Sequence, residues 1–539
     1  MLQLLVSTEA TPSTVLVVAV AVAGVAALLV RAQPLFLDPR AQVSPVPSSF
    51  DTLHKDRASA PVVRPSTTLP VVGDLLHLAR HANRGHDWFL ELQRESGGKP
   101  VLLKLPGKPD LLLIATPELF EAMQKDQLES FAKGENFHDL LVDLLGDSIF
   151  IVNGVKWKRQ RQFLARLFTA RTLRYHVAPI VQKHTHTLLD LLGSAAEARQ
   201  VVDVTEIMHR FALEAFVELA MGVELGQLSA RAQHPFQAAF DTAQLVIARR
   251  FSVPTFVWKL KRWLNVGSER RLRESLEVVN TMALDLINQS MEQRKHQSDD
   301  RAKHLVDQIL EMAETDQLEV HPTEVRDIMV ATMVAGRDTT ADTMSWFFHV
   351  LSHEPQAVAA IRAELLENVP QLATDPTFVP AMDDIQHLPI LEATIREVMR
   401  LFPAGAFTVK HCIQDAWLPD GTFVRAGTDV GVAVYALHRL ESVWGDDAAQ
   451  FKPERFLDDS TGKLRSFSPF QLATFSAGPR SCVGKALAML QLKMVLATVL
   501  FHFDLVEEPG QEVVYTAGIT LTMKNPLLMR PRRTVAIGA

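Results

Sequence analysis

Phe475-Ser-Ala-Gly478-Pro-Arg480-Ser-Cys482-Val-Gly484 is the most informative stretch of this chain, because it places one cysteine in a short loop between two glycines. The apolar run that follows has helical spacing. A helix N-terminus and a nearby arginine favour the thiolate form of a cysteine. Glycines let the backbone approach a large, flat group. We therefore expect the loop to supply the axial thiolate ligand of a haem iron.

At every fixed position this stretch resembles Phe-x-x-Gly-x-Arg-x-Cys-x-Gly, the haem-binding signature of the cytochrome P450 family. The resemblance implies that Cys482 ligates the iron of haem b, and that Phe475, Gly478, Arg480 and Gly484 form part of the haem site. It also implies an enzyme, a monooxygenase that uses O2 as co-substrate. From the residues alone, a buried structural cysteine beside a helix start is the alternative.

The composition excludes several other classes of protein. The chain has 539 residues, of which 47% are hydrophobic, and a net charge of −7. No basic stripe with interleaved aromatic residues is present, so nucleic acid is not an expected partner. Its two cysteines, Cys412 and Cys482, argue against a secreted disulfide scaffold. Cys412 is then expected to be an ordinary small buried residue.

The N-terminus predicts a membrane anchor. Val15 to Val30 is an unbroken run of apolar and small residues, with no Lys or Arg before it and Arg31 directly after it. A cleaved signal peptide is the alternative, but its basic n-region is missing. We expect residues 1–33 to be a retained single-pass transmembrane signal anchor in the endoplasmic reticulum, which leaves the rest of the chain in the cytosol.

Residues 34–70 are rich in proline and serine, which is typical of a stiff linker. The end of this segment resembles the proline-rich hinge of membrane-bound P450s, so residues 71–539 are expected to form the catalytic domain. Helical spacing dominates that region, and a long helix is predicted after Pro322, while short strand-like runs include Val101–Leu105 and Val430–Val434. This pattern predicts a mainly α protein with a minor β portion, and the resemblance implies the P450 fold, a large helical domain with a small sheet region.

A second motif lies midway along the predicted long helix, at residues 335 to 340 (Ala-Gly-Arg-Asp-Thr-Thr). Asp338 and Thr339 compete with the helix's own hydrogen bonds, and Gly336 weakens the helix by roughly 1 kcal/mol. This pattern favours a functional kink or groove; a capped turn in a broken helix is the alternative. The resemblance implies that Asp338 and Thr339 relay protons to bound dioxygen, while Ala335 and Gly336 border the haem and Gly336 leaves room for oxygen.

Two further motifs concern the support of the haem. Glu397 and Arg400 are three residues apart on a predicted helix, where they can form an ion pair, although a solvated surface pair is the alternative. The resemblance implies that they form a structural cluster with Arg455. It also implies that Arg480 of the loop, together with Trp157, Arg161 and Lys410 from elsewhere in the chain, contacts the haem propionates. For Lys410, His411 is an open alternative.

Three segments narrow the resemblance to the fatty-acid omega-hydroxylases of plants and oomycetes: Val334–Phe348, Leu418–Thr422 and Leu440–Gly445. This implies a lipophilic small-molecule substrate, with hydroxylation at the terminal carbon of a fatty acid. The turn at Ala404-Gly405 departs from the subgroup on the substrate side. Candidates for the substrate channel, each of which could equally be plain core, are Phe137, Leu141, Val334, Ala406, Phe407 and Ile519.

Electrons must come from a partner, because no Gly-x-Gly-x-x-Gly motif follows a predicted strand. The resemblance implies a membrane-bound NADPH-cytochrome reductase, for which Lys485 and Lys493 could offer positive charge. Alternatives within the enzyme class are monooxygenases of alkanes, sterols or xenobiotics. The non-enzyme alternative is a membrane haem carrier or gas sensor, which would not need Asp338 and Thr339.

Overall fold

The computed structural model describes residues 62–66, 68–69, 71–230, 234–296, 304–315 and 321–534. The predicted anchor, residues 1–33, and most of the predicted hinge, residues 34–70, lie outside the described residues. The described end of the hinge is attached to the body of the protein. Val63 forms a parallel bridge with Val101, and the Thr68 hydroxyl donates a 2.8 Å hydrogen bond to the Asp74 carboxylate.

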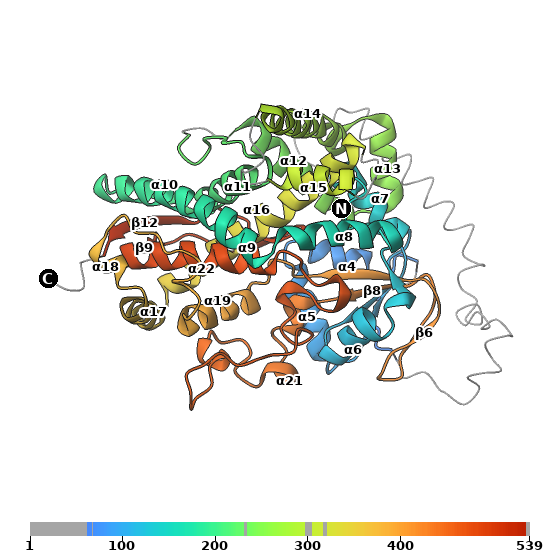
Figure 1. The fold of residues 1–539 in the computed structure, drawn as a ribbon. Coiled ribbons are helices and arrows are strands. Elements are labelled where there is room, and N and C mark those ends of the chain that lie inside the picture. The colour runs from blue at the N-terminus through green and yellow to red at the C-terminus, as the bar shows by residue number, and fades with distance from the viewer. Residues whose placement is uncertain are drawn as a thin grey trace.

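Helices make up most of the described chain (Figure 1). Several begin with proline in their first turn, where the missing N–H costs nothing, as at Pro235, Pro322 and Pro389. The helices are α4 (Leu75–Arg80), α5 (Gly85–Glu95), α6 (Pro117–Glu121), α7 (Glu135–Leu145), α8 (Gly154–Leu167), α9 (Ala170–Thr172), α10 (Ala178–Glu197), α11 (Val204–Met221), α12 (Pro235–Phe251), α13 (Thr255–Leu264), α14 (Gly267–His296), α15 (Leu305–Thr315), α16 (Pro322–Ser352), α17 (Pro355–Asn368), α18 (Gln371–Thr374), α19 (Pro389–Leu401), α20 (Val434–Leu437), α21 (Glu441–Trp444) and α22 (Lys485–His502).

The strands form one five-stranded sheet and three smaller ones. The large sheet has the order β1-β2-β8-β5-β3, in which only β2 and β8 are parallel. The other sheets are β4-β12-β9, β10-β11 and β6-β7. The strands are β1 (Val101–Leu103), β2 (Leu111–Ile114), β3 (Phe131–Ala132), β4 (Val202–Asp203), β5 (Thr408–Cys412), β6 (Ala416–Trp417), β7 (Phe423–Val424), β8 (Asp429–Val432), β9 (Phe503–Glu507), β10 (Tyr515–Ala517), β11 (Leu521–Met523) and β12 (Leu528–Arg533).

Helix α16 runs through the middle of the molecule, with α12 and α14 above it and α19 and α22 below it in the view of Figure 1. Its first half, including Val325 and Val334, packs with α7, α12 and α14 in what we call the α14 core. Its second half, including Ala341 and Phe347, packs with α10, α19 and α22 in the α22 core. The 335–340 motif therefore lies where the helix passes from one hydrophobic core to the other.

Helix α22 is long and apolar enough to cross a membrane, and it is the one such helix in the part of the chain that the structure describes. About two thirds of it (67%) is buried inside the protein, where it belongs to the α22 core. Burial on most sides explains its composition, since a helix that is hydrophobic all round is a core helix in a large protein. The predicted mainly α fold with a minor β portion is confirmed.

Candidate active site

The cysteine loop is a tight structure held by its own backbone. It spans two short 3-10 turns and leads into α22, and the Cys482 amide donates a 2.8 Å hydrogen bond to the Phe475 carbonyl. Gly478 has φ +67°, and a Cβ there would lie 2.5 Å from the Gln124 carbonyl oxygen. A Cβ at Gly484 would lie 3.9 Å from the Cys482 sulfur. Gly478 is thus required by a close approach of protein backbone, whereas Gly484 keeps the space beside the sulfur open.

The Cys482 side chain is exposed, but protein surrounds it on most sides. This burial raises the pKa of the thiol, and the Gly484 amide, Arg161 and Lys485 oppose the rise. Arg480, the loop arginine expected to favour the thiolate, makes its hydrogen bonds with another segment. Its guanidinium turns away to the Val152 carbonyl at 3.2 and 3.1 Å and to the Asn153 side chain at 3.0 Å. Cys412, in contrast, is fully buried in the sheet region, as predicted.

Helix α16 is buried on all sides from Ile328 to Phe348 except at Ala335, Gly336 and Thr339. Residues 335 and 339 are four apart, so they share one face of the helix. These three residues are only half-buried although they lie in the middle of the protein, which indicates a hollow beside the segment that is predicted to bind oxygen. The Thr339 hydroxyl donates to the Ala335 carbonyl at 2.6 Å, while the helix continues without a break. The alternative of a capped turn in a broken helix is therefore excluded, and the half-buried face at Ala335 and Thr339 supports the expected groove.

Gly336 has a packing reason of its own. A Cβ at this position would lie 2.7 Å from the ring of Phe216 on α11, so α11 and α16 can approach each other only because residue 336 is glycine. The predicted role of Gly336 in leaving room for oxygen stays a prediction.

Asp338 lies on the side of α16 that faces α12. Its carboxylate accepts a 2.9 Å hydrogen bond from Arg337, which also bonds to Asp241 of α12 at 2.6 Å. Burial raises the pKa of the Asp338 carboxyl, and Arg337 partly offsets the rise. Asp338 thus binds protons more readily than an exposed aspartate, which a proton relay needs.

Asp342, one turn after Asp338, is a second buried carboxyl that the sequence analysis missed. Burial raises its pKa to about 6, opposed by His209, whose Nε2 lies 3.5 Å away. The Thr522 hydroxyl donates to it at 3.0 Å. Buried acids therefore stand on successive turns of α16, and the i, i+4 spacing of the two aspartates was the signal that could have revealed this.

The predicted Glu397–Arg400–Arg455 cluster is present, and its two central members are 0% exposed. Glu397 accepts from Arg400 at 2.6 and 2.8 Å, from Arg455 at 3.1 Å and from the Lys452 amide at 2.8 Å. Arg400 also donates to the His438 and Ala448 carbonyls, at 2.5 and 2.7 Å. The surface-pair alternative is excluded, because both charges are fully desolvated. The role of the cluster in haem retention stays a prediction.

His438 connects this cluster to the cysteine loop. It is 0% exposed; its Nδ1 lies 3.1 Å from the Arg400 carbonyl, and its Nε2 accepts a 2.9 Å hydrogen bond from the Ala473 amide, where the loop's first turn begins. Burial, with Arg400 and Arg439 adding to it, lowers the pKa of His438 to about 3, so the ring is neutral. Sequence reasoning missed His438, because a lone histidine in an apolar segment carries no distinctive signal.

Four cations gather beside the cysteine loop without any carboxylate partner among the residues that the structure describes: Arg161, Arg480, Lys133 and Lys410. Lys410, on β5, is 2% exposed, and its Nζ has no hydrogen-bond partner. Burial, then Lys133 and Arg480, lowers the pKa of Lys410 to about 6, and burial and Arg480 lower that of Lys133 to about 7. Such a group is expected to bind an anion, because buried cations need a counter-charge.

The side chains predicted to contact haem propionates do lie together. Arg161 donates to the Ser481 carbonyl of the cysteine loop at 2.5 Å, and the Arg480 guanidinium lies 4.5 Å from the centre of the Trp157 ring. Lys410 joins them through its electrostatic coupling to Arg480, whereas His411 is paired with Asp429 at 2.7 Å. The orphaned Lys410 and the open space beside Cys482 fit a flat, dianionic group such as haem. Lys133 was missed, since an isolated lysine before a helix has no signature.

The predicted channel residues fall into two groups. Leu141 and Val334 belong to the α14 core, and Phe137 and Ile519 pack against it, as does Val483, the neighbour of Cys482. Ala406 and Phe407 instead lie with the five-stranded sheet. Four of the six candidates therefore pack in or against the α14 core, which also includes the first half of α16, and the other two pack with the five-stranded sheet. Their role as a substrate channel stays a prediction.

Comparison with known proteins gives a consistent result. The model of the family "Cytochrome P450" matches residues 63–529. The chain is 33% identical over 494 residues to Cytochrome P450 CYP94D108 of Paris polyphylla, covering 89% of this chain and 95% of that protein. It is 32% identical over 476 residues to Cytochrome P450 94B1 of Arabidopsis thaliana, covering 87% and 91%. The crystal structure of the cytochrome P450DA heme domain is similar, with a TM-score of 0.75, 19% identity and coverage of 89% and 99%.

Proposed function

Since this chain belongs to the cytochrome P450 family and is a haem-thiolate monooxygenase, we propose that it hydroxylates the terminal (omega) carbon of fatty acids. The family implies haem, dioxygen and electrons that NADPH supplies through a reductase. Haem, when bound through Cys482, activates dioxygen by reduction and inserts one oxygen atom into a C–H bond. The remaining work falls to the residues of this chain.

The proposed proton relay starts from two neighbouring side chains on α16. Thr339 holds its hydroxyl proton toward the Ala335 carbonyl, at the half-buried part of the helix, and burial raises the pKa of the Asp338 carboxyl. Positioned acids of this kind contribute about 10²–10⁴-fold to a rate. We infer that Thr339 delivers protons at the oxygen site and that Asp338 resupplies them.

The observation that carries the substrate proposal is the apolar α14 core, which includes the first half of α16 as far as Val334, directly before the relay segment. Val334 is 5% exposed and Leu141 4%, and both belong to the α14 core, against which Phe137 and Ile519 pack. An apolar lining suits a saturated acyl chain, whose burial gains about 0.8 kcal/mol per CH2 group. The resemblance of Val334–Phe348 to fatty-acid omega-hydroxylases adds the regiochemistry.

We further propose that residues 1–33 anchor the protein in the endoplasmic reticulum, with the catalytic domain in the cytosol. Exposed apolar side chains support contact with a membrane: on α13 they are Phe256, Leu260 and Trp263, 60%, 46% and 80% exposed, and they alternate with lysines and an arginine. For the reductase, Lys485 is exposed beside the cysteine loop. Lys493, the other expected docking charge, is buried and paired with Glu392 at 3.1 Å, so that expectation was wrong.

The test is product analysis in membranes that contain the full chain, a reductase and NADPH. Fatty acids, alkanes and sterols are supplied as a mixed panel, and products are identified by mass spectrometry beside a Cys482→Ala control. Terminally hydroxylated fatty acids that are absent from the control are the expected result. Hydroxylated sterols or alkanes without hydroxylated fatty acids would refute the substrate proposal and leave the monooxygenase assignment intact.

The relay is tested separately with Thr339→Ala. This variant is expected to keep its reduced carbon-monoxide spectrum but to release most of its electrons as hydrogen peroxide, with product per NADPH falling about tenfold or more. Thr343→Ala is the matched control, because Thr343 makes the same bond to the carbonyl four residues earlier, at 2.7 Å, but is buried. Equal coupling in the two variants would remove Thr339 from the relay.

A further inference from the structure

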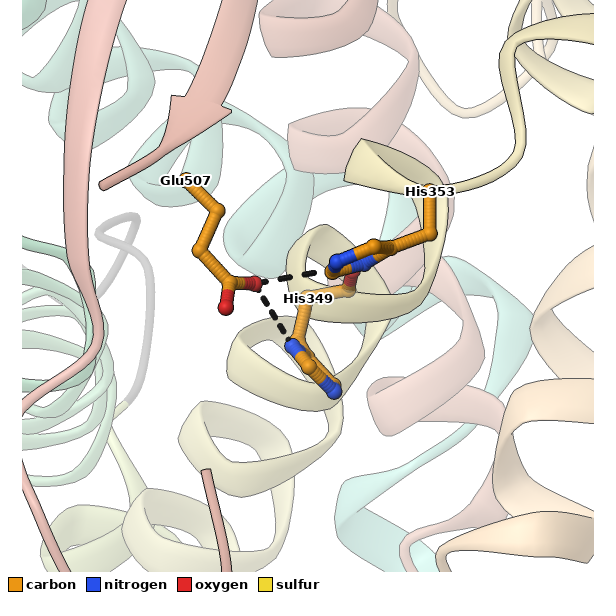
Figure 2. A group of neighbouring side chains, drawn as sticks. All are labelled: His349, His353 and Glu507. Carbon is orange, nitrogen blue, oxygen red and sulfur yellow. Dashed lines mark hydrogen bonds and ion pairs between the residues drawn. The ribbon is translucent and has the colours of Figure 1, made fainter. Parts of the chain in front are cut away.

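The end of α16 carries two histidines one turn apart, and β9 brings a carboxylate up to them (Figure 2). His349 lies in the last turn of α16 and His353 is its C-cap residue, and the centres of their rings are 5.2 Å apart. One possible ligand atom from each of His349, His353 and Glu507 lies within 4.8 Å of the other two. Across the described residues this is the one group of three or more His, Cys, Asp or Glu side chains that meets this spacing.

The carboxylate of Glu507 is shared by both histidines. His349 Nδ1 lies 2.8 Å from Glu507 Oε2, and His353 Nδ1 lies 4.0 Å from the same oxygen. The Ser352 hydroxyl is 3.4 Å from it. No lysine or arginine in the described part of the chain pairs with this carboxylate within 4.0 Å. Among the described residues Glu507 therefore has two imidazoles and a hydroxyl beside it but no lysine or arginine, an arrangement that leaves room for a cation.

Burial divides the group into fixed and accessible members. The side chains of His349 and Glu507 are 21% and 15% exposed, whereas His353 is 60% exposed. The His349 ring packs edge-on against Trp346, which is itself stacked on Phe402 at 4.1 Å. Two ligands are thus held by packing, and the third lies at the surface, where an ion could enter.

We propose that His349, His353 and Glu507 bind one divalent transition-metal ion, with zinc the ion that this ligand set suits best. Imidazole suits zinc, and zinc also accepts carboxylate oxygen, with bonds of about 2.0–2.2 Å. Tetrahedral ligands at that distance are about 3.3 Å apart. The His349–Glu507 pair, at 2.8 Å, must therefore open slightly, and the exposed His353 ring must rotate to bring its nitrogen closer to Glu507 than the present 4.0 Å. His353 Nδ1 now lies 3.0 Å from the His349 carbonyl, a contact that this rotation exchanges for the metal.

The bound ion would join the end of α16 to β9. His349 lies ten residues after Thr339, which is about 15 Å along the helix axis. The ion is therefore outside the reaction site and acts on stability. Because it binds the folded arrangement of two elements that are distant in the sequence, zinc raises the stability of the folded state by mass action.

The experiment uses the full-length holoprotein purified without a polyhistidine tag and stripped with a chelator. Zinc chloride is titrated in competition with a chromophoric chelator, and the thermal unfolding midpoint is measured with and without zinc. The expected result is one zinc equivalent, and an affinity reduced about tenfold or more in Glu507→Gln and in His349→Ala. The zinc-dependent rise in midpoint is expected to disappear in both variants.

His81→Ala is the matched control, because His77 and His81 have the same four-residue spacing on α4 but no carboxylate pairs with them in the described chain. The proposal is overturned if wild type and Glu507→Gln bind zinc with equal affinity. It is also overturned if His81→Ala lowers the zinc affinity as much as Glu507→Gln does. If the variants fail to fold, zinc-edge X-ray absorption of the wild type decides. A shell with two imidazoles and oxygen supports the site, and a shell of oxygen alone or one containing sulfur overturns it.

Discussion

Replacing Glu397 by glutamine is expected to destabilise the folded protein by about 3–5 kcal/mol. Glu397 accepts four hydrogen bonds, three from the guanidinium groups of Arg400 and Arg455 and one from the Lys452 amide. Glutamine keeps the shape, but one oxygen becomes an N–H2 group that faces these donors. Arg400, which is 0% exposed, then keeps a charge that nothing compensates.

This loss is a large part of a typical stability of about 5–15 kcal/mol. The effect also reaches the haem site, since Arg400 is joined through His438 to Ala473 at the start of the cysteine loop. We therefore expect the urea midpoint measured by far-ultraviolet circular dichroism and the midpoint measured by the reduced carbon-monoxide spectrum to fall together.

The matched control is Glu274→Gln on α14. Glu274 pairs with Arg270 at 2.8 Å, but their side chains are 52% and 63% exposed, so its loss is expected to cost less than about 1 kcal/mol. A Glu397→Gln midpoint equal to that of Glu274→Gln would refute the reasoning, because it would mean that the buried Arg400 charge finds compensation elsewhere.

Three further predictions concern the haem site. Lys410→Met is expected to release haem into excess apomyoglobin about tenfold faster or more, because a charge-assisted contact to a propionate is worth about 1.5–3 kcal/mol. Lys410→Arg keeps the positive charge and should recover part of the loss. Gly478→Ala is expected to abolish the thiolate spectrum in the carbon-monoxide assay, because φ at this position is +67° and a Cβ would lie 2.5 Å from a backbone oxygen. Gly405→Ala is the control and should match wild type in the same assay, because a Cβ at residue 405 would have nothing within 4 Å. The pKa of His438 in the folded protein is about 3, below its ordinary value of 6.5, so below pH 6.5 the unfolded chain binds a proton that the folded protein does not. The free energy of unfolding therefore falls as the pH drops below 6.5, by at most about 1.4 kcal/mol per pH unit for this group. Urea titrations from pH 7 to 5 should show a shallower slope for His438→Gln, and an unchanged slope would contradict this assignment.

Much of the site could be predicted because its residues form short motifs. The cysteine loop, the Asp338–Thr339 pair of α16 and the Glu397–Arg400 pair each span only a few consecutive residues. The helix that carries Asp338 was predicted from its apolar spacing and begins at Pro322, as expected. Local spacing fixes which residues share a helix face, and these predictions needed little more.

The remaining parts depend on contacts between distant segments. Lys133 and His438 have no local signature, and each acquires its importance only when β3, β5 or the cysteine loop packs beside it. His349 and His353 have the four-residue spacing of a metal-ligand pair. Their proposed third partner, Glu507, comes from β9, which follows α22 in the sequence, so local spacing could not reveal it. Ala406 and Phe407 pack with the five-stranded sheet rather than with the α14 core, a grouping that sequence spacing does not reveal, and their role in a substrate channel stays a prediction.

The division of α16 between two hydrophobic cores has a consequence for how this enzyme can diversify. Val334 and the residues before it pack with α12 and α14, while the cysteine loop leads into α22, which packs with the other half of the helix. Substitutions in the α14 core can therefore leave the α22 core, from which the helix behind the cysteine loop is built, unchanged. The two sides meet at Val483, beside Cys482, and at the Arg337–Asp241 ion pair, so libraries aimed at new substrates belong on α7, α12 and α14 away from Asp241.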